Sequence, residues 1–307
     1  MISIIIPCFN TPKEWLSECL ESIAAQTFTD WEALIVDDAS LVPVLASDLP
    51  GGGGDPRFRI VRHDRNRGPA AARNTAVAYS RGELLFTMDS DDMLEPKALE
   101  VLSVKLRSST GIDCVYPQFR TFGGASLLWE MPMLGVGDMI SDQWVPGPGV
   151  LMKREFYDKV GGYCEEEVFR YGNEDWDFWL GAASAGFVVE KVPQDLYHYR
   201  ISGGSLSNST TKRRHYRTIE RMYERHKAFI DEQGMADRFL YDGYYFSVRR
   251  CPSAELTAVM RSGFSHAKSA RDVLRLCLIF LKRVAAGTIG IARRATSGLA
   301  GRGETTR

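Results

Sequence analysis

The sequence predicts an α/β fold in which a mostly parallel central sheet is flanked by helices and followed by a helical C-terminal extension. Three observations lead to this prediction. Short apolar runs alternate with amphipathic or Ala-rich stretches up to Pro96. Acidic residues directly follow two of these runs, as they do where strands end at the carboxyl edge of a sheet. From about Ser209 the composition changes to charged helix.

The N-terminal elements are expected to alternate between strand and helix. Apolar runs supply the strands, and residues 13–23 carry apolar side chains at helical spacing behind Pro12, which suits a first helical turn. The loop at 41–57 contains four consecutive glycines and is expected to be a surface insertion. The predicted strands are 3–7, 31–36, 58–61 and 84–88, and further helices are predicted at 68–79 and from Pro96 to about Leu106.

The second half of the chain has a weaker pattern. Residues 112–150 are expected to hold short strands and a Gly/Pro-rich turn at 145–149. Helices are predicted at 152–160 and 174–185, and strands at 188–192 and 196–200. We therefore expect a catalytic domain at 1–208, divided into halves at about 1–93 and 94–208, and a helical extension at 209–307.

Composition excludes several classes of protein. The chain has 307 residues, a formal net charge of -1 and 44% hydrophobic residues, so it is not built as a nucleic-acid binder. Its six cysteines share no CxxC spacing, which argues against a zinc site or a disulfide framework and fits a reducing cytoplasm. Residues 1–7 resemble a first strand rather than a signal peptide, and no segment is long enough to span a bilayer.

Three carboxylates lie within the run Met88-Asp89-Ser90-Asp91-Asp92, directly after a predicted buried strand. Carboxylates this close repel one another unless a cation lies among them, and hard divalent cations prefer oxygen ligands. A turn around Ser90 could direct Asp89 and Asp91 at the same ion. The run therefore indicates a metal that holds a phosphate-bearing ligand, although a solvated acidic turn would have the same sequence.

Two further clusters are expected at the same sheet edge. Residues 7–10 and the pair Asp37-Asp38 both follow predicted strands, and a carboxylate there could accept a hydrogen bond from a base imide or a ribose hydroxyl. Taken alone, the pair is more typical of a capped turn. The helix that begins at Gly68-Pro69 can bind an anion with its first amides, and Arg73 adds a permanent cation. The simpler interpretation of this Ala-rich stretch is a packing helix.

A fourth cluster, at 172–179, contains Glu174, Asp175 and Asp177 beside two tryptophans and a phenylalanine. One of these carboxylates could be a general base, and the aromatic rings could stack on a sugar. Acids at a helix N-terminus also complement the helix dipole, which is the structural alternative.

Taken together, these segments resemble family 2 glycosyltransferases, which have the GT-A nucleotide-diphospho-sugar transferase fold. The resemblance covers residues 3–207, and its specificity comes from the order of the pieces rather than from any one of them. The segments that carry it are Ser3 to Asn10, Val36 to Ser40, Asn66 to Asn74, Met88 to Asp92, Gly161-Gly162-Tyr163, Glu174 to Asp177, Tyr199-Arg200 and Ser205 to Ser207.

The resemblance implies an inverting transfer of a sugar from a nucleoside-diphosphate sugar, with a UDP-sugar favoured, to a hydroxyl acceptor in cell-surface polysaccharide or glycolipid synthesis. It implies Asp175 as catalytic base, oriented by Glu174, and a Mn²⁺ or Mg²⁺ ion bound by Asp91 with Asp89. The residues implied for nucleotide-sugar binding are Pro7, Phe9, Asn10, Asp38, Arg73, Asp89, Ser90 and Arg200.

The sequence departs from the family pattern at one position. Some members carry a metal-binding histidine in the loop after the Tyr-Arg strand, where this chain has 201–205 without histidine. His198 is the nearest substitute, and strand alternation could direct its ring elsewhere, so it is a weak metal candidate.

The C-terminal third suggests contacts outside the catalytic reaction. Residues 210–232 alternate basic and apolar side chains, as in a solvated helix that packs on a domain. Residues 268–294 hold seven basic residues against one acid around an apolar run at 276–281. This segment predicts either a peripheral contact with the inner face of the cytoplasmic membrane or a core or homodimer helix. A membrane-anchored saccharide acceptor would suit the first interpretation.

Two other functions use acidic strand ends. One is a metal-dependent nucleotidyltransferase or phosphatase, and the other is an inactive nucleotide-sugar-binding or assembly module. The chain lacks a GxxxxGK[ST] loop and a GxGxxG after its first strand, which disfavours NTPases and dinucleotide enzymes. The presence of Asp91 and of Glu174-Asp175 favours an active transferase over the inactive module.

Overall fold

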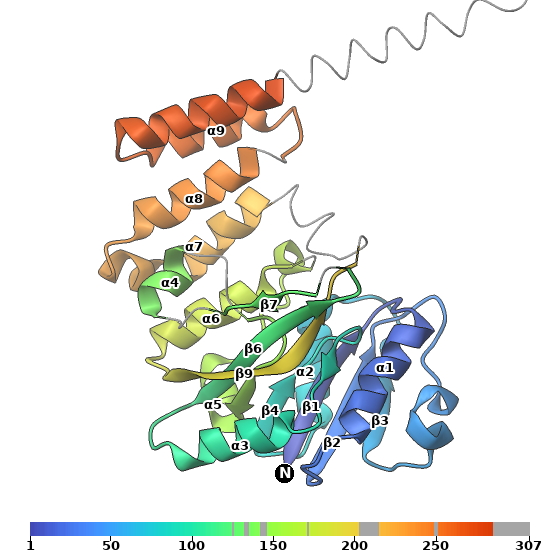
Figure 1. Ribbon diagram of the computed structural model, residues 1–307. Helices are drawn as coiled ribbons and strands as arrows, with labels where there is room; N and C mark the ends of the chain where they lie inside the picture. The colour runs from blue at the N-terminus through green and yellow to red at the C-terminus, as the bar shows by residue number, and fades with distance from the viewer. Residues whose placement is uncertain are drawn as a thin grey trace, which may run out of the picture. The chain divides into compact units, whose positions relative to one another are not determined.

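The computed structural model describes residues 1–124, 126–131, 135–141, 146–170, 172–202, 215–248 and 251–284. The chain divides into two compact units, Met1–Thr211 and Lys212–Arg307. The first contains a curved mixed sheet with helices on both faces, and the second is helical (Figure 1).

The sheet of the first unit has the strand order β3-β2-β1-β4-β8-β6-β9-β5, and β7 pairs with β6. From β3 to β4 all neighbours are parallel, and β6 and β9 are also parallel, whereas β8 and β5 run antiparallel to their neighbours. The strands are β1 Ile2–Cys8, β2 Trp31–Asp37, β3 Phe58–Arg62, β4 Leu84–Thr87, β5 Met93–Leu94, β6 Cys114–Phe122, β7 Leu128–Trp129, β8 Leu151–Lys153 and β9 Val189–Arg200.

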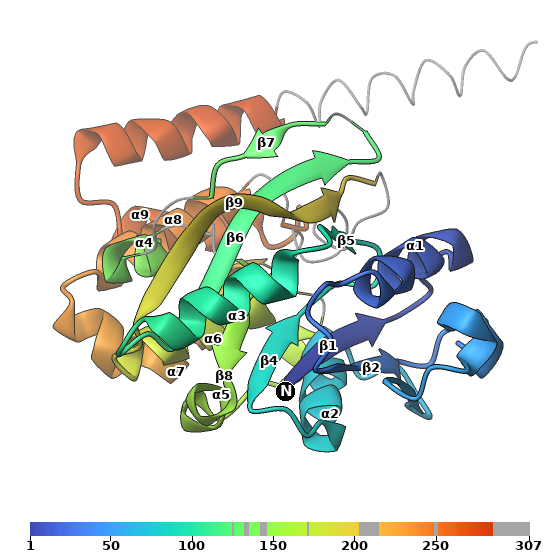
Figure 2. The ribbon, with the colours of Figure 1, turned by 60° about the horizontal axis from the view of Figure 1, so that its bottom comes forward.

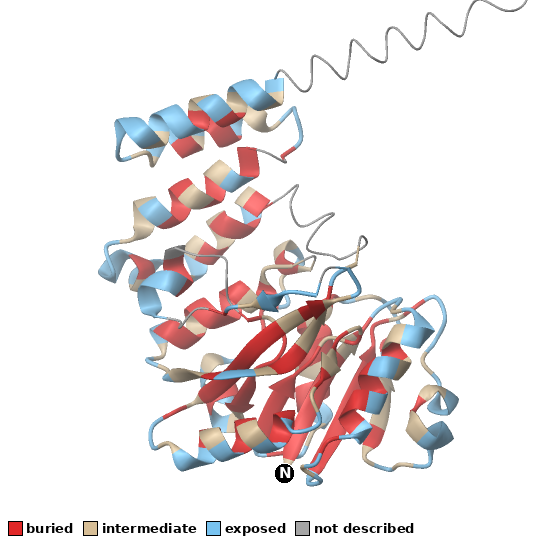
Figure 3. Ribbon diagram, viewed as in Figure 1, coloured by how far each residue is buried: buried red, intermediate tan, exposed pale blue. Residues whose placement is uncertain are grey.

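The two faces of the sheet are covered by different helices. Helices α1 and α3 lie on one face, and α2, α5 and α6 lie on the other (Figures 1 and 2). Because both faces are covered, β1, β2 and β4 are apolar almost throughout and are coloured as buried in Figure 3. The helices are α1 Lys13–Ala24, α2 Pro69–Tyr79, α3 Ala98–Ser108, α4 Val136–Ser141, α5 Arg154–Val160 and α6 Glu174–Ser184.

The second unit consists of α7 His215–Glu232, α8 Ala236–Val248, α9 Leu256–Ser265 and a further helical segment at 270–284. Its core includes Ile219, Met222, Leu240 and Leu276. Gly243 lies directly against Ile219, so the absence of a side chain there lets α7 and α8 approach closely. Over the described ranges, no helix combines the length and the apolar character needed to cross a membrane.

The α/β fold class is confirmed, and most predicted elements of the first unit agree with the structure within two residues. Three details were wrong. Residues 152 and 153 belong to strand β8 rather than to the helix that follows. The predicted strands at 188–192 and 196–200 are one strand, β9, whose pairing with β6 is shifted near Pro117 by a bulge. The region 112–150 holds a short strand as expected, β7, but also the nine-residue strand β6 and helix α4, which were not expected.

Candidate active site

The carboxyl ends of β1, β2 and β4 meet at one edge of the sheet. In the parallel register, Cys8 pairs with Asp37 and Ile5 pairs with Thr87. The segments after these strands therefore lie side by side, and they contain two of the four clusters predicted from the sequence, residues 7–10 with Asp37-Asp38 and the acidic run after β4. The pairing of the buried strands brings these segments together at the carboxyl edge of the sheet. Open α/β sheets bind their ligands at this edge.

The Asp37-Asp38 pair at the end of β2 is saturated by protein donors. Asp37 accepts from the amides of Ser40 and Val44 and pairs with Arg62. Burial favours a raised pKa for Asp37, but these hydrogen bonds outweigh it and the pKa is lowered. Asp37 therefore stabilises the loop after β2.

Asp38 is saturated in the same way by other groups. It is 3% exposed and accepts from the amides of Arg67 and Gly68 at 2.8 and 2.7 Å, while its Oδ1 lies 2.6 Å from Nδ1 of His63. These contacts fix the N-terminus of α2 at the sheet edge. Asp38 therefore has a structural role, and its contact with the nucleobase stays a prediction.

The loops after β1 and β2 adopt unusual backbone conformations. Asn10 and Ala39 have φ values of 53° and 60°, in the left-handed region that non-glycine residues rarely adopt. Asn10 stabilises both loops, because its amide donates to the Ser40 hydroxyl and its side-chain oxygen accepts from the Leu41 amide. Such strain is common at ligand sites. Pro7 is half-buried in β1, between the buried residues Ile6 and Cys8, and Phe9 after the strand is 46% exposed.

The polar residues after β4 differ in their surroundings. Ser90 is buried, and its hydroxyl lies 2.7 Å from that of Thr11. Asp92 is 1% exposed and accepts from the Tyr197 hydroxyl and the Arg200 amide at 2.6 and 2.7 Å. Burial and the charge of Asp89 raise the pKa of Asp92. Asp92 thus joins β4 to β9 and is a structural residue.

Asp91 differs from Asp92, because no other described residue donates a hydrogen bond to its carboxylate. Burial and the neighbouring charge of Asp89 raise its pKa to about 6. A divalent cation would relieve both effects, so the donor set fits the predicted Mn²⁺ or Mg²⁺. Within the described ranges, no group of three or more His, Cys, Asp or Glu side chains could hold a metal.

Arg73 connects the acids after β4 to the cluster at α6. It is 4% exposed, and its guanidinium donates to Asp89 at 3.0 Å and to Glu174 at 2.5 Å. Burial alone would lower the pKa of Arg73, but the charges of Asp89 and Glu174 outweigh this effect and raise the pKa above its ordinary value. The guanidinium also lies 5.4 Å from the ring centre of Tyr163. Nε of Arg73 and Oε2 of Glu174 are buried without a hydrogen-bond partner in the described part of the chain.

Asp175 is the second residue of α6, which begins at Glu174, and Asn173 before the helix has a φ of 67°. One carboxylate oxygen accepts from the Trp176 amide at 2.8 Å. The other faces Gly147, where a Cβ atom would lie only 2.9 Å away. Burial and then the charge of Glu174 raise the pKa of Asp175 to about 7, against the opposing effect of Arg73. A carboxylate with this pKa is suited to general base catalysis near neutral pH.

The loop before β8 lies against Asp175 and is fixed from two sides. Trp179 donates from Nε1 to the Pro146 carbonyl at 2.8 Å, and the Thr87 hydroxyl donates to the Gly147 carbonyl at 3.3 Å. The loop therefore connects β4, which leads into the acidic run, to the helix that carries Asp175.

Arg200 and His198 lie in surroundings that the sequence did not indicate. Arg200 is 8% exposed, ion-pairs with Glu18, donates to the Asp91 carbonyl at 2.6 Å and lies over the ring of Phe122. His198 is paired with Glu95, with 3.0 Å between Nε2 and the carboxylate. Neither the predicted diphosphate contact of Arg200 nor a metal role for His198 is visible in these contacts.

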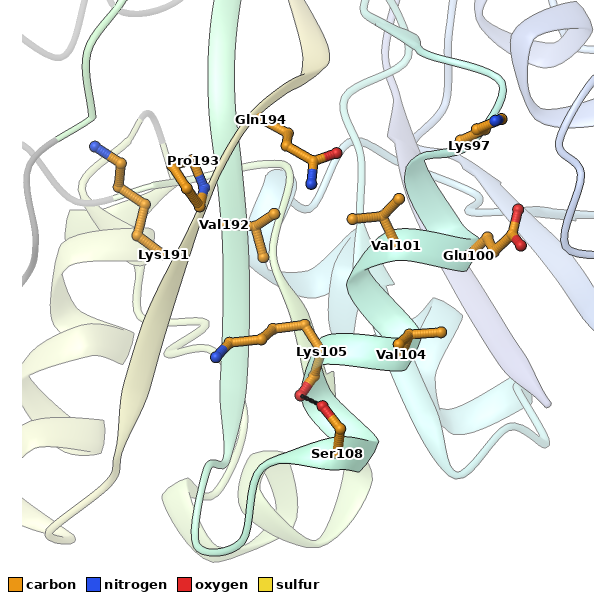
Figure 4. A pocket seen from close by; sticks show the side chains of 10 residues that line it. All are labelled: Lys97, Glu100, Val101, Val104, Lys105, Ser108, Lys191, Val192, Pro193 and Gln194. Carbon is orange, nitrogen blue, oxygen red and sulfur yellow. Dashed lines mark hydrogen bonds between the residues drawn. The ribbon is translucent and has the colours of Figure 1, made fainter.

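A separate groove lies between α3 and β9 and has a volume of 590 Å³ (Figure 4). Its apolar side chains, such as Val101 and Val192, are accompanied by three lysines. Of these, Lys105 pairs with Glu190, and Lys191 donates to the Met131 carbonyl. None of the predicted site residues lines this groove.

Several contributors were not recognised from the sequence. Tyr197 supports the acidic run through Asp92 and through the Asp89 amide, Gly147 contacts the predicted base, and Glu18 pairs with Arg200. For Gly147, the only signal in the sequence is the Gly/Pro-rich turn at 145–149. Tyr197 and Glu18 lie on a strand and a helix that are far from the acidic run in the sequence.

The sequence of residues 3–167 matches the family model described as "Glycosyl transferase family 2". The chain belongs to this family. The match spans the strand ends described above up to the segment before α6, so the resemblance predicted from the motifs is confirmed, and the protein is a glycosyltransferase.

Curated relatives agree with this membership in the glycosyltransferase family. The chain is 29% identical over 239 residues to "Uncharacterized glycosyltransferase YwdF" of Bacillus subtilis (strain 168), covering 73% of this chain and 84% of the relative. It is 38% identical over 116 residues to a chondroitin synthase of Escherichia coli, covering 38% of this chain and only 17% of that protein.

Among solved structures, residues 1–349 of TarS from S. aureus, in complex with UDP-GlcNAc, have the same fold. The TM-score is 0.63 at 17% identity, over 91% of this chain and 79% of that chain. This likeness confirms the GT-A fold.

Proposed function

We propose that the protein is a metal-dependent, inverting glycosyltransferase that moves a sugar from a nucleoside-diphosphate sugar to a hydroxyl of a saccharide or lipid-linked saccharide. The observation that carries the proposal is the Arg73 bridge. Arg73 ion-pairs with both Asp89 and Glu174, which are far apart in the sequence, and so holds them together. Asp91 and Asp175 are thereby brought to one site with raised pKa values.

The donor would bind along the edge formed by β1, β2 and β4. The loops held by Asn10 and Asp38 offer a surface for the nucleoside, with Pro7 and Phe9 beside them. Arg73 is a permanent cation close to Asp89. A Mn²⁺ or Mg²⁺ ion held by Asp91 with Asp89 would supply positive charge to the leaving diphosphate. We favour a UDP-sugar, since the fold matches a TarS structure that contains UDP-GlcNAc.

The acceptor hydroxyl would be deprotonated by Asp175. With a pKa of about 7, the carboxylate is about half ionised at neutral pH, and the ionised form can accept the proton of the acceptor hydroxyl. The Trp176 amide holds one carboxylate oxygen of Asp175, and the other lies close to Gly147. Attack from the side of the base, opposite the leaving diphosphate, inverts the configuration at the anomeric carbon. The transition state resembles that of glycoside hydrolysis.

The product would belong to a cell-surface polysaccharide or glycolipid, as suggested by the relatedness to a chondroitin synthase and to an O-antigen biosynthesis protein of Myxococcus xanthus. We place the reaction in the cytoplasm, at the inner face of the cytoplasmic membrane. All six cysteines are free, and five of them are buried, which suits a reducing compartment.

The experiment that tests this function uses the purified full chain with Mn²⁺ and a panel of nucleotide sugars. Slow donor hydrolysis identifies the sugar and base, and saccharide acceptors are then added. We expect one donor to be consumed, with loss of activity on chelation and recovery with Mn²⁺. The anomeric configuration of the product, read by NMR, should be inverted. A retained configuration, or full activity of Asp175→Asn, would contradict the proposed mechanism.

A further inference from the structure

The helical segment 270–284 of the second unit carries a row of exposed apolar side chains. Leu274, Leu278 and Leu281 are 59%, 49% and 60% exposed, and Val273 is 42% exposed. The opposite face is buried, because Leu276 and Ile279 are 0% and 6% exposed. The segment therefore packs on its own unit with one face and offers a second apolar face to its surroundings, as the pale blue turns of this helix in Figure 3 indicate.

The spacing of these residues forms a continuous stripe. Positions 274, 278 and 281 follow the i, i+4, i+7 pattern of one helix face, and 273 lies at its margin. Single exposed leucines are common on protein surfaces, but three aligned on 15 residues form a patch of the kind that marks an interaction site.

Cations accompany the stripe on one side. At 100° per residue, Arg271, Arg275 and Lys282 fall within about 40° of one another, next to Leu278. All three are exposed, and Arg275 lies over the ring of Tyr245 at 4.8 Å. The only acid in the segment, Asp272, accepts from Ser269, and its carbonyl accepts from the Tyr241 hydroxyl. The exposed surface thus combines an apolar stripe with a cationic margin.

We propose that this face of residues 270–284 lies in the interface of an anionic lipid bilayer, with the leucine stripe among the acyl chains and the three cations at the headgroups. An apolar stripe beside a basic margin is the pattern of a helix that lies in the plane of an anionic membrane surface. The proposal deepens the proposed function by placing the enzyme beside a lipid-linked acceptor, and it rests on that function only for the acceptor.

A second copy of this chain fits the same surface less well. A two-fold dimer interface brings identical patches together, so the margin of one copy would face that of the other. Three cations on each side would then repel one another, whereas anionic headgroups neutralise them. The charge of the margin therefore favours lipid over a homodimer.

The test is flotation of the full chain with vesicles of phosphatidylcholine alone or mixed with phosphatidylglycerol. We expect the protein to float only with the mixed vesicles, and less so at high salt. The variant Leu274→Ser/Leu278→Ser/Leu281→Ser should lose at least about tenfold in binding. Arg271→Glu/Lys282→Glu should lose a similar factor, since each basic residue near such a surface contributes about fivefold.

The matched control is Val104→Ser/Leu127→Ser, which removes two apolar residues that are each 61% exposed in the first unit and lie outside the proposed site. It should float like the wild type. Unchanged circular dichroism and donor hydrolysis in every variant would show that folding and the proposed reaction are intact. Vesicle binding without sugar transfer would count against the proposed function and not against this surface.

Two results would overturn the proposal. One is flotation of the triple leucine variant at wild-type level, or equal binding to neutral vesicles. The other is a wild-type dimer in light scattering that the triple leucine variant converts to a monomer, which would assign the stripe to a second copy.

Discussion

The ends of β2 and β4 carry the same kind of sequence, a pair of carboxylates after a buried parallel strand, but their surroundings differ. Asp37 and Asp38 accept hydrogen bonds from backbone amides and lie beside Arg62 and His63. Asp91 has no donor from any other described residue, and its pKa is raised, whereas that of Asp37 is lowered. The comparison separates acids that stabilise a loop from an acid suited to a cation.

The largest expected effect concerns Asp91. Asp91→Asn should reduce transfer at least about 10³-fold, because it removes the predicted metal ligand. Its free energy of unfolding should stay the same or rise, since the amide ends the repulsion with Asp89. Initial rates with Mn²⁺ and with chelator, together with urea unfolding, measure both. A variant that keeps more than a tenth of the activity would remove Asp91 from the site.

The opposite outcome is expected for Asp38. Asp38→Asn places an amide group against the N–H groups of Arg67 and Gly68, so the free energy of unfolding should fall by about 2 to 3 kcal/mol. Asp64→Asn, at an exposed position of the following loop, is the matched control and should change it by less than about 0.5 kcal/mol. If Asp38→Asn were as stable as the control, the distinction between the two acid pairs would fail.

The third acid pair combines both kinds of surroundings, because Glu174 is bound by Arg73 while Asp175 faces Gly147. Gly147→Ala should lower kcat about tenfold to a hundredfold by displacing the base, with donor affinity unchanged. Gly137→Ala is the control, since a Cβ there meets nothing within 4 Å. Steady-state rates and calorimetric donor binding measure the two quantities. A parallel loss of donor affinity would indicate a general disturbance of the fold instead.

The smallest effect is on pH dependence. A base must be ionised to accept a proton, so kcat/KM should rise about tenfold per pH unit below pH 7 and level off above it. The midpoint should lie near the pKa of Asp175, about 7. In Glu174→Gln the midpoint should move to lower pH, because the charge of Glu174 raises that pKa. A profile normalised to its own plateau tests this, and an unchanged midpoint would assign the titration to another group.

Local sequence patterns were sufficient for most of the fold. The parallel strands are recognisable because burial on both faces requires uninterrupted apolar runs such as Ala33 to Val36. The region 112–150 was harder, because β6 has tertiary partners on both sides, β8 and β9, and its polar Gln118 is buried where it pairs with β9. Nothing in the local sequence reports which distant strand will cover such a residue.

The sequence by itself determined which residue types gather at the sheet edge. A buried strand must end, and the polar residues after it must lie at its carboxyl end, so Asp38 and Asp89 could be placed without coordinates. Only the tertiary structure decided what each acid does. Donors 3 to 25 residues away in sequence saturate Asp37, and donors 25 to 30 residues away saturate Asp38. Tyr197 and Arg200 donate to the Asp92 side chain, whereas no other described residue donates to the carboxylate of Asp91. Hydrogen bonds depend on distance and direction in space, which a one-dimensional pattern does not contain.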